Sequence, residues 1–229
     1  EPKPDFQEFL LIPNSKSVGE AFEKNKNKKS EVEKVLKKIN NYFKSEKNDE
    51  DAWMISLNEK QILEILTKLK IPLGLDIAAS SFYRREKYSY KNPVFRRTKE
   101  EQFNYLDNLI KNFNLFYVED PFQEEDFESF SKLLKKFPNV LIVGDDLIVT
   151  NYNRFEKALE KKSVNAIIVK PNQCGSLLEV ERVCKLAKEN NIRTVFSHRS
   201  GETEETILAD LAFGFQADFL KCGITGKER

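Results

Sequence analysis

The chain has 229 residues, 40% of them apolar and 33% charged, which is enough for one large domain or two small ones. Its 38 basic and 37 acidic residues give a net charge of +1, which excludes an electrostatic basis for binding nucleic acid or an anionic membrane. No apolar run reaches the ~18–20 residues of a membrane-spanning helix. Three cysteines without a C-x-x-C pair argue against a disulfide framework or a structural zinc site and predict a cytoplasmic protein.

Seven short apolar runs recur along the chain. They are rich in Val, Ile, Leu and Phe and do not alternate strictly with polar residues, which is typical of strands buried on both faces. The runs cover residues 9–12, 71–75, 115–118, 141–143, 166–169, 194–196 and 219–220.

Helical patterns separate these runs. Apolar residues follow helical spacing around 31–43 and 59–69, between the first two predicted strands. Thr98 with Glu101, and Ser176 with Glu179, each predict a capping box, while Asn151 predicts an N-cap for the helix that follows it.

After Glu119 the predicted strand ends recur at intervals of about 25 residues, room for one strand, one helix and two loops. This alternation predicts an α/β protein with a parallel sheet, either open or closed into a barrel. No Gly-rich phosphate motif follows any predicted strand, which weakens a nucleotide-binding interpretation.

Charged residues stand at the carboxyl ends of the predicted strands, where a parallel barrel places its active site. Asp76, Glu119 and Asp145 follow three strands in succession and would offer the oxygen ligands that suit Mg²⁺. One such carboxylate alone would be read as a helix cap, but three together favour a metal site. Asp120 and Asp146 are interpreted as caps or supporting groups.

The other strand ends carry cations. Lys170 follows a very apolar run, and the pattern leaves open whether it extends its ammonium group to the rim or acts as a base with a lowered pKa. Arg199 and Ser200 either bind an anion, aided by a helix opening near 201–204, or simply cap that helix. His198, the chain's one histidine, precedes them, and Lys221 ends the last strand.

Six stretches, in this order along the chain, resemble the enolase family, most closely its archaeal branch. They are Gln7-Glu8-Phe9, Gly74 through Ser80, Val118-Glu119-Asp120-Pro121-Phe122, Val143 through Asn151, Lys170-Pro171-Asn172-Gln173 and Ser197 through Glu204. The resemblance implies a modified (β/α)₈ TIM barrel with a β-β-α-α start, of which about seven strands are present. It also implies that 1–229 is a partial barrel domain without the family's N-terminal lid domain, first barrel strand and last helix.

The resemblance implies an Mg²⁺-dependent phosphopyruvate hydratase, which interconverts 2-phosphoglycerate and phosphoenolpyruvate plus water in glycolysis and gluconeogenesis. Lys170 would be the base, and Glu8 would lie near the leaving hydroxyl. Glu50 would be the acid, although Asn48-Asp49-Glu50-Asp51 lacks the family's flanking glycines. Asp76, Glu119 and Asp145 would bind magnesium, and the substrate would contact His198, Arg199, Ser200 and Lys221.

Alternatives remain at this point. The chain is expected to be either part of a longer enolase, whose full-length form would be a homodimer or larger, or a divergent short homologue. The alternative function is a catalytically silent relative that binds Mg²⁺ and a phosphorylated acid or a protein partner. A related enzyme acting on a non-phosphorylated acid fits less well, because Arg199 and Ser200 suit a phosphate.

Overall fold

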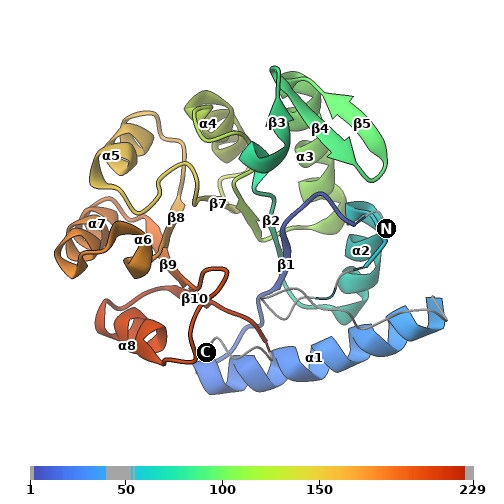
Figure 1. Ribbon diagram of the computed structural model, residues 1–229, viewed down its shortest axis with the longest axis horizontal. Helices are drawn as coiled ribbons and strands as arrows, with labels where there is room; N and C mark the ends of the chain where they lie inside the picture. Colours follow the sequence, from blue (N-terminus) through green and yellow to red (C-terminus); the bar gives the residue numbers. More distant parts are fainter. Residues whose placement is uncertain (1–2, 40–52, 54, 225–229) are drawn as a thin grey trace.

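A computed structural model describes residues 3–39, 53 and 55–224. Its centre is a curled seven-stranded sheet with the order β1-β2-β6-β7-β8-β9-β10 (Figure 1). The strands are β1 (Glu8–Leu11), β2 (Leu73–Asp76), β6 (Tyr117–Glu119), β7 (Leu141–Gly144), β8 (Ala166–Val169), β9 (Arg193–Ser197) and β10 (Phe219–Lys221). The seven predicted strands are thus confirmed, as an incomplete TIM-barrel sheet of α/β type.

The direction of the strands brings the predicted site residues to one edge. All neighbouring strands run parallel except β1, which is antiparallel to β2 and pairs Glu8 with Asp76. The first residue of β1 therefore lies at the same edge as the carboxyl ends of the other six strands. The part of the predicted β-β-α-α start that lies in this sequence is also found, since two helices separate the paired strands β1 and β2.

Helices surround the outside of the curled sheet (Figure 1). Each of the helices α3, α4, α5 and α7 precedes a parallel strand, as the alternating pattern predicts. The helices are α1 (Val18–Ile39), α2 (Glu59–Leu66), α3 (Lys99–Phe113), α4 (Phe127–Lys136), α5 (Tyr152–Glu160), α6 (Pro171–Cys174), α7 (Leu177–Glu189) and α8 (Ile207–Gly214), with 3₁₀ turns η1 (Thr67–Leu69) and η2 (Ala79–Phe82).

Two of the three predicted helix caps are confirmed. Thr98 and Glu101 form the complete capping box of α3, and the Asn151 side chain accepts a hydrogen bond from the Arg154 N–H at the start of α5. The capping box predicted for Ser176 is wrong, because the Ser176 side chain makes no capping bond. Glu179 pairs instead with Arg182 at 2.8 Å on the same helix.

The sheet separates two apolar layers. The larger layer packs the outer face of the sheet against the helices. The smaller layer fills the inner face, with Tyr117, Val143, Ala166, Ile168 and Val195 at its centre. Strands with apolar side chains on both faces explain the near-continuous apolar runs of the sequence.

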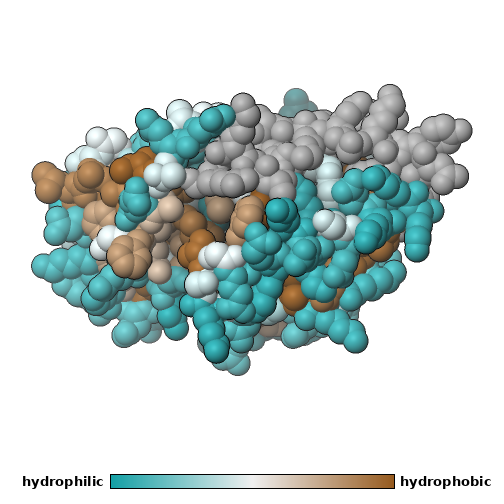
Figure 2. Space-filling view, turned by 90° about the horizontal axis from the view of Figure 1, so that it is seen from below, coloured by the Kyte–Doolittle hydropathy of each residue, from teal (hydrophilic) through white to brown (hydrophobic). Residues whose placement is uncertain are grey.

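The sheet stays open between β1 and β10, which end its strand order without pairing to each other. Helix α8 packs on β9 and β10 beside this opening. Its Phe213 is 88% exposed and Ile207 is 54% exposed. The view from below shows apolar side chains gathered on the left, where α8 lies, and more polar side chains among the coloured residues on the right (Figure 2).

A second, three-stranded antiparallel sheet follows β2 and was not predicted from the sequence. Its strands are β3 (Tyr83–Arg84), β4 (Lys87–Lys91) and β5 (Val94–Arg97). No helix of the described ranges is long and apolar enough to cross a membrane.

Candidate active site

The structure brings most of the predicted site residues to one pocket of ≈ 180 Å³ at the carboxyl edge of the sheet. Gln7 and Ser197 complete its lining. The predicted residues in the lining are Glu8, Asp76, Lys170, His198, Arg199, Ser200 and Lys221. Glu119 and Asp145 reach the same cluster through ion pairs with two of these lysines, whereas Glu50 lies outside the described residues.

Lys221 lies at the centre of the cluster and contacts three carboxylates from three strands. Its Nζ is 2.7 Å from Glu8 Oε2, 2.7 Å from Asp76 Oδ2 and 2.8 Å from Glu119 Oε1. Lys221 is 8% exposed and Glu119 is fully buried. As the structure stands, this ammonium group binds carboxylates of the protein rather than facing the pocket as a free cation.

Burial and mutual repulsion shift the pKa values of these carboxylates. Burial raises the pKa of Asp76 well above its ordinary value, and the charge of Glu119 raises it further against the opposing effect of Lys221. Burial also raises the pKa of Glu119, despite the opposing charge of Lys221. Burial alone would raise the pKa of Glu8, but Lys221 and His198 outweigh it and hold this carboxyl ionised far below its usual range.

Lys170 and Asp145 form a second ion pair, with 2.5 Å between Nζ and Oδ2. Burial lowers the pKa of Lys170, but the charge and hydrogen bond of Asp145 outweigh it, so the pKa lies above its ordinary value. The lowered pKa considered from the sequence is therefore not what this arrangement gives: Lys170 is held protonated here. Its backbone N–H donates to the Thr150 hydroxyl at 2.9 Å.

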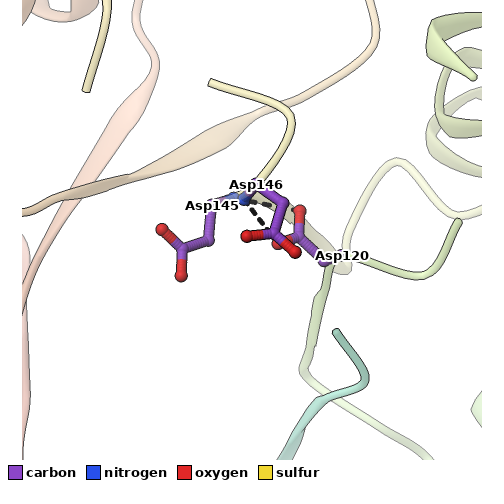
Figure 3. A group of neighbouring side chains, drawn as sticks. All are labelled: Asp120, Asp145 and Asp146. Atoms are coloured by element: carbon purple, nitrogen blue, oxygen red, sulfur yellow. Dashed lines mark hydrogen bonds between the residues drawn. The ribbon is translucent and has the colours of Figure 1, made fainter. Parts of the chain in front are cut away.

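Asp120 holds the backbone at the carboxyl end of β7. Its two carboxylate oxygens accept hydrogen bonds from the N–H groups of Asp145 (3.0 Å) and Asp146 (2.6 Å), as Figure 3 shows. The carboxylates of the three residues lie close enough to hold a cation, with ligand atoms within 4.8 Å of one another. However, the Asp145 carboxylate points away from the other two (Figure 3). The supporting role predicted for Asp120 agrees with these contacts.

The residues after β9 line the pocket from another side. His198 is 5% exposed, and its Nε2 lies 3.7 Å from Glu8 Oε1. Arg199 and Ser200 are exposed and line the pocket. The prediction that a helix begins near 201–204 is wrong. Helix α8 begins at Ile207, and Gly201 has a φ of 76°, outside the helical region.

Several turns that follow the site strands adopt left-handed backbone conformations. Ala78, Asp120, Val149 and Thr150 have φ values of 47°, 41°, 49° and 51°. This region is unfavourable for residues with a Cβ, most of all for the β-branched Val149 and Thr150. Such strain gathers at functional sites, where the surrounding contacts hold it.

The chemistry of the cluster fits a divalent cation. The buried Asp76 and Glu119 and the partly buried Glu8 and Asp145 provide carboxylate oxygens, which are the ligands that Mg²⁺ prefers. Only two ammonium groups, those of Lys170 and Lys221, form ion pairs with these four carboxylates among the residues the structure describes. Burial is the main cause of the raised pKa values of Asp76 and Glu119, and repulsion from neighbouring carboxylates adds to it.

Sequence reasoning missed two polar contacts of the site. Thr150 supports the Lys170 backbone, and the Tyr117 hydroxyl donates to Glu119 Oε2 at 2.5 Å. Tyr117 precedes Glu119 by two residues on β6, so the period-two pattern of a strand places both side chains on one face. This two-residue spacing is the sequence pattern from which the contact between Tyr117 and Glu119 could have been predicted.

The comparisons with known proteins agree with this geometry. A sequence model for "Enolase, C-terminal TIM barrel domain" matches residues 1–229. The enolase of Pyrobaculum aerophilum is 41% identical over 99% of this chain and 57% of its own length. Those of Methanosphaera stadtmanae and Archaeoglobus fulgidus are 40% and 38% identical, over 99% and 97% of this chain and 58% and 57% of their own lengths.

The chain therefore spans a little over half the length of these curated relatives. The match covers the whole sequence, from the strand that carries Glu8 to the strand that carries Lys221. This chain belongs to the enolase family and corresponds to its C-terminal TIM-barrel domain.

Proposed function

We propose that this chain carries the active site of a phosphopyruvate hydratase, an Mg²⁺-dependent carbon–oxygen lyase that interconverts 2-phosphoglycerate and phosphoenolpyruvate plus water. One observation supports it most: carboxylates at the carboxyl ends of β2, β6 and β7 lie at the same sheet edge as Lys170, which follows β8 and contacts one of them. The proposed setting is glycolysis and gluconeogenesis in the cytoplasm, with the full-length protein a homodimer or larger.

Asp76, Glu119 and Asp145 are the residues proposed to hold Mg²⁺. When bound, Mg²⁺ supplies positive charge that stabilises the anion formed by loss of the proton next to the substrate carboxylate. These residues provide carboxylates that are shielded from solvent, since Asp76 is 3% exposed and Glu119 is fully buried. Electrostatic interactions are stronger in such a setting than in water.

Lys170 is proposed as the base that takes this proton. A base must be neutral, so Lys170 can accept a proton only when Asp145 no longer stabilises its charge. The side chain of Lys170 is 15% exposed and lines the pocket, so its Nζ can reach a bound molecule. Release from Asp145 would leave burial as the dominant influence on the pKa of Lys170, and burial lowers it.

The opposite wall of the pocket is proposed to bind the substrate anion. Arg199 and Ser200 offer a guanidinium fork and a hydroxyl to a phosphate, and both are exposed at the pocket. Lys221 is proposed to bind the substrate carboxylate, for which it must give up at least one of its three carboxylate partners. Glu8 is ionised and therefore suits accepting a hydrogen bond near the leaving hydroxyl. Glu50 remains the proposed acid, outside the described residues.

A catalytically silent relative that binds Mg²⁺ and a phosphorylated acid is the second candidate. The observation that favours it is the ion pair with Asp145, which holds Lys170 in the protonated form that cannot act as a base.

One experiment separates the two candidates. The full-length protein is incubated with 2-phosphoglycerate, with and without Mg²⁺, and phosphoenolpyruvate is followed by its ultraviolet absorbance. Mg²⁺-dependent formation of phosphoenolpyruvate is expected. Binding of phosphoenolpyruvate by calorimetry without any turnover would favour the silent relative, and neither binding nor turnover would contradict both candidates.

A further inference from the structure

The carboxylate of Glu119 has its two oxygens held by two different groups. Oε2 accepts a hydrogen bond from the Tyr117 hydroxyl at 2.5 Å, and Oε1 accepts one from Lys221 Nζ at 2.8 Å. Both donors are buried, with Tyr117 3% exposed and Lys221 8% exposed. The two oxygens of Glu119 are therefore not equivalent: one is tied to the barrel interior and the other faces the charged cluster.

Tyr117 reaches Glu119 from the inner face of the sheet. It belongs to the inner apolar layer with Val143, Ala166, Ile168 and Val195, none of which carries a side-chain donor. In the part of the chain that the structure describes, the side-chain hydrogen bonds of Glu119 are those to Tyr117 and Lys221. Tyr117 therefore supplies the donor that satisfies the inner oxygen of a fully buried carboxylate, a group that is costly to bury without one.

The neighbouring strand leaves room for the Tyr117 ring. Gly74 on β2 pairs with Tyr117 in the sheet. A Cβ at position 74 would lie 3.0 Å from Tyr117 Cβ, 3.1 Å from Tyr117 Cδ1 and 3.0 Å from Ile12 Cδ1. Even an alanine there would press on the ring, so the absence of a side chain at Gly74 accommodates the position from which Tyr117 reaches Glu119.

We propose that Tyr117 is a positioning residue that holds Glu119 Oε2 inside the barrel, so that Glu119 offers only Oε1 to a bound cation. This inference rests on the proposed function in so far as Glu119 is a cation ligand. A ligand with one available oxygen suits Mg²⁺, which takes six ligands in strict octahedral geometry. A carboxylate free to use both oxygens suits the larger Ca²⁺, which accepts six to eight ligands and bidentate carboxylates.

The test compares Tyr117→Phe with Tyr90→Phe in the full-length protein. Tyr90 is a matched control, because it is also 3% exposed and its hydroxyl donates a buried hydrogen bond, to Gln102 at 2.7 Å, away from the cluster. Isothermal titration calorimetry measures the Kd of each protein for Mg²⁺ and, separately, for Ca²⁺. Thermal unfolding of wild type and both variants measures how much stability is lost with each hydroxyl.

We expect Tyr117→Phe to weaken Mg²⁺ binding by roughly 10- to 100-fold, the range typical of losing a group that orients a metal ligand. Ca²⁺ binding should weaken much less, so the preference for Mg²⁺ over Ca²⁺ falls, while Tyr90→Phe keeps the wild-type Kd for both ions. If Tyr117 only stabilised the fold, Tyr117→Phe would not change the ratio of the Kd for Mg²⁺ to the Kd for Ca²⁺.

Some results would overturn the positioning role of Tyr117 alone, and another would also overturn the proposed function. If wild type binds Mg²⁺ and Tyr117→Phe matches Tyr90→Phe, or weakens both ions equally, the positioning role is wrong while the proposed function stands. If wild type binds neither ion, the proposed Mg²⁺-dependent function and this inference fail together. A wild type that binds Mg²⁺ but shows no turnover overturns the lyase activity alone, and Tyr117 is still tested by the cation ratio.

Discussion

Lys221 on β10 and Glu8 on β1 form an ion pair with 2.7 Å between Nζ and Oε2, and this contact joins the two open edges of the sheet. The side chains are 7% and 14% exposed, so solvent screens the pair little. Since the same ammonium also contacts the buried Asp76 and Glu119, one lysine partly offsets the charge of three carboxylates. The ion pair therefore connects the two edge strands of the open sheet within the charged site.

Replacing Lys221 by methionine should destabilise the fold strongly. The variant leaves buried carboxylates without their cation, and removing one partner of a buried pair costs roughly 3–5 kcal/mol. Lys37→Met is the control, because the Lys37 side chain is 61% exposed and pairs with Glu33 on α1, and such surface pairs contribute about 0–1 kcal/mol. Urea unfolding measures both. Equal losses in the two variants would mean that the Lys221 contacts contribute no more than a surface pair.

Mg²⁺ should compensate part of the Lys221→Met loss. Without Lys221, a bound cation becomes the main source of positive charge for Asp76 and Glu119, so the rise in Tm on adding Mg²⁺ should exceed that of wild type. Thermal unfolding at matched Mg²⁺ concentrations measures this. A smaller rise than in wild type would indicate that Lys221 helps to build the cation site rather than competing for its carboxylates.

Lys170→Ala should abolish exchange of the substrate proton next to the carboxylate with solvent deuterium. The proposed role of Lys170 as base predicts a loss of roughly 10²- to 10⁴-fold. Lys161→Ala, at an exposed lysine at the end of α5, should exchange at the wild-type rate. NMR of 2-phosphoglycerate incubated with each protein in deuterium oxide measures the rate. Wild-type exchange in Lys170→Ala would remove Lys170 from the role of base.

Much of the strand arrangement and of the pocket could be predicted from the sequence, because both follow from the apolar runs and the charged residues that end them. Several site strands are runs of apolar residues with a charged residue at or just after the carboxyl end, as in 166–169 followed by Lys170. Such runs are buried on both faces, and parallel strands bring their carboxyl ends together. The convergence of Asp76, Lys170 and Lys221 on one pocket follows from this rule.

What could not be predicted depends on contacts between segments or on weak local patterns. The start of α1 at Val18 was missed, since only residues from about 31 onward showed apolar spacing and 23–31 carry no apolar side chain. The sheet of β3, β4 and β5 was missed because its strands are short and β5 exposes its apolar residues Val94 and Phe95. That Lys221 contacts three carboxylates is a matter of tertiary geometry, which no spacing along the sequence encodes.

Asp120 should tolerate asparagine much better than alanine. Its φ of 41° lies in the left-handed region, which asparagine enters more readily than alanine does, and an asparagine oxygen can still accept one of the two backbone hydrogen bonds. We expect Asp120→Ala to cost roughly 3 kcal/mol, from two lost hydrogen bonds and backbone strain, and Asp120→Asn about 1 kcal/mol or less. Urea unfolding measures both. Similar losses would show that the backbone of Asp145 does not depend on this support.

Glu59 gives the fold a pH dependence outside the active site. This first residue of α2 is 2% exposed, and its Oε1 has no hydrogen-bond partner among the residues that the structure describes. Burial raises the pKa of Glu59 from 4.5 to about 7, and nearby Asp5 adds to the rise. Because the folded pKa is the higher one, the stability that the neutral carboxyl provides is complete below pH 4.5 and is lost as the pH rises through about 7.

Glu59→Gln should therefore remove a loss of stability between about pH 4.5 and pH 7 that amounts to roughly 3 kcal/mol at most in wild type. The amide stays neutral throughout, so the variant should be more stable than wild type at pH 8 and similar to it at pH 4.5. Glu64→Gln, at an exposed glutamate on the same helix, should keep the wild-type slope. Urea unfolding across this range measures the three slopes, and a Glu59→Gln slope equal to that of wild type would show that Glu59 ionises at its ordinary pKa.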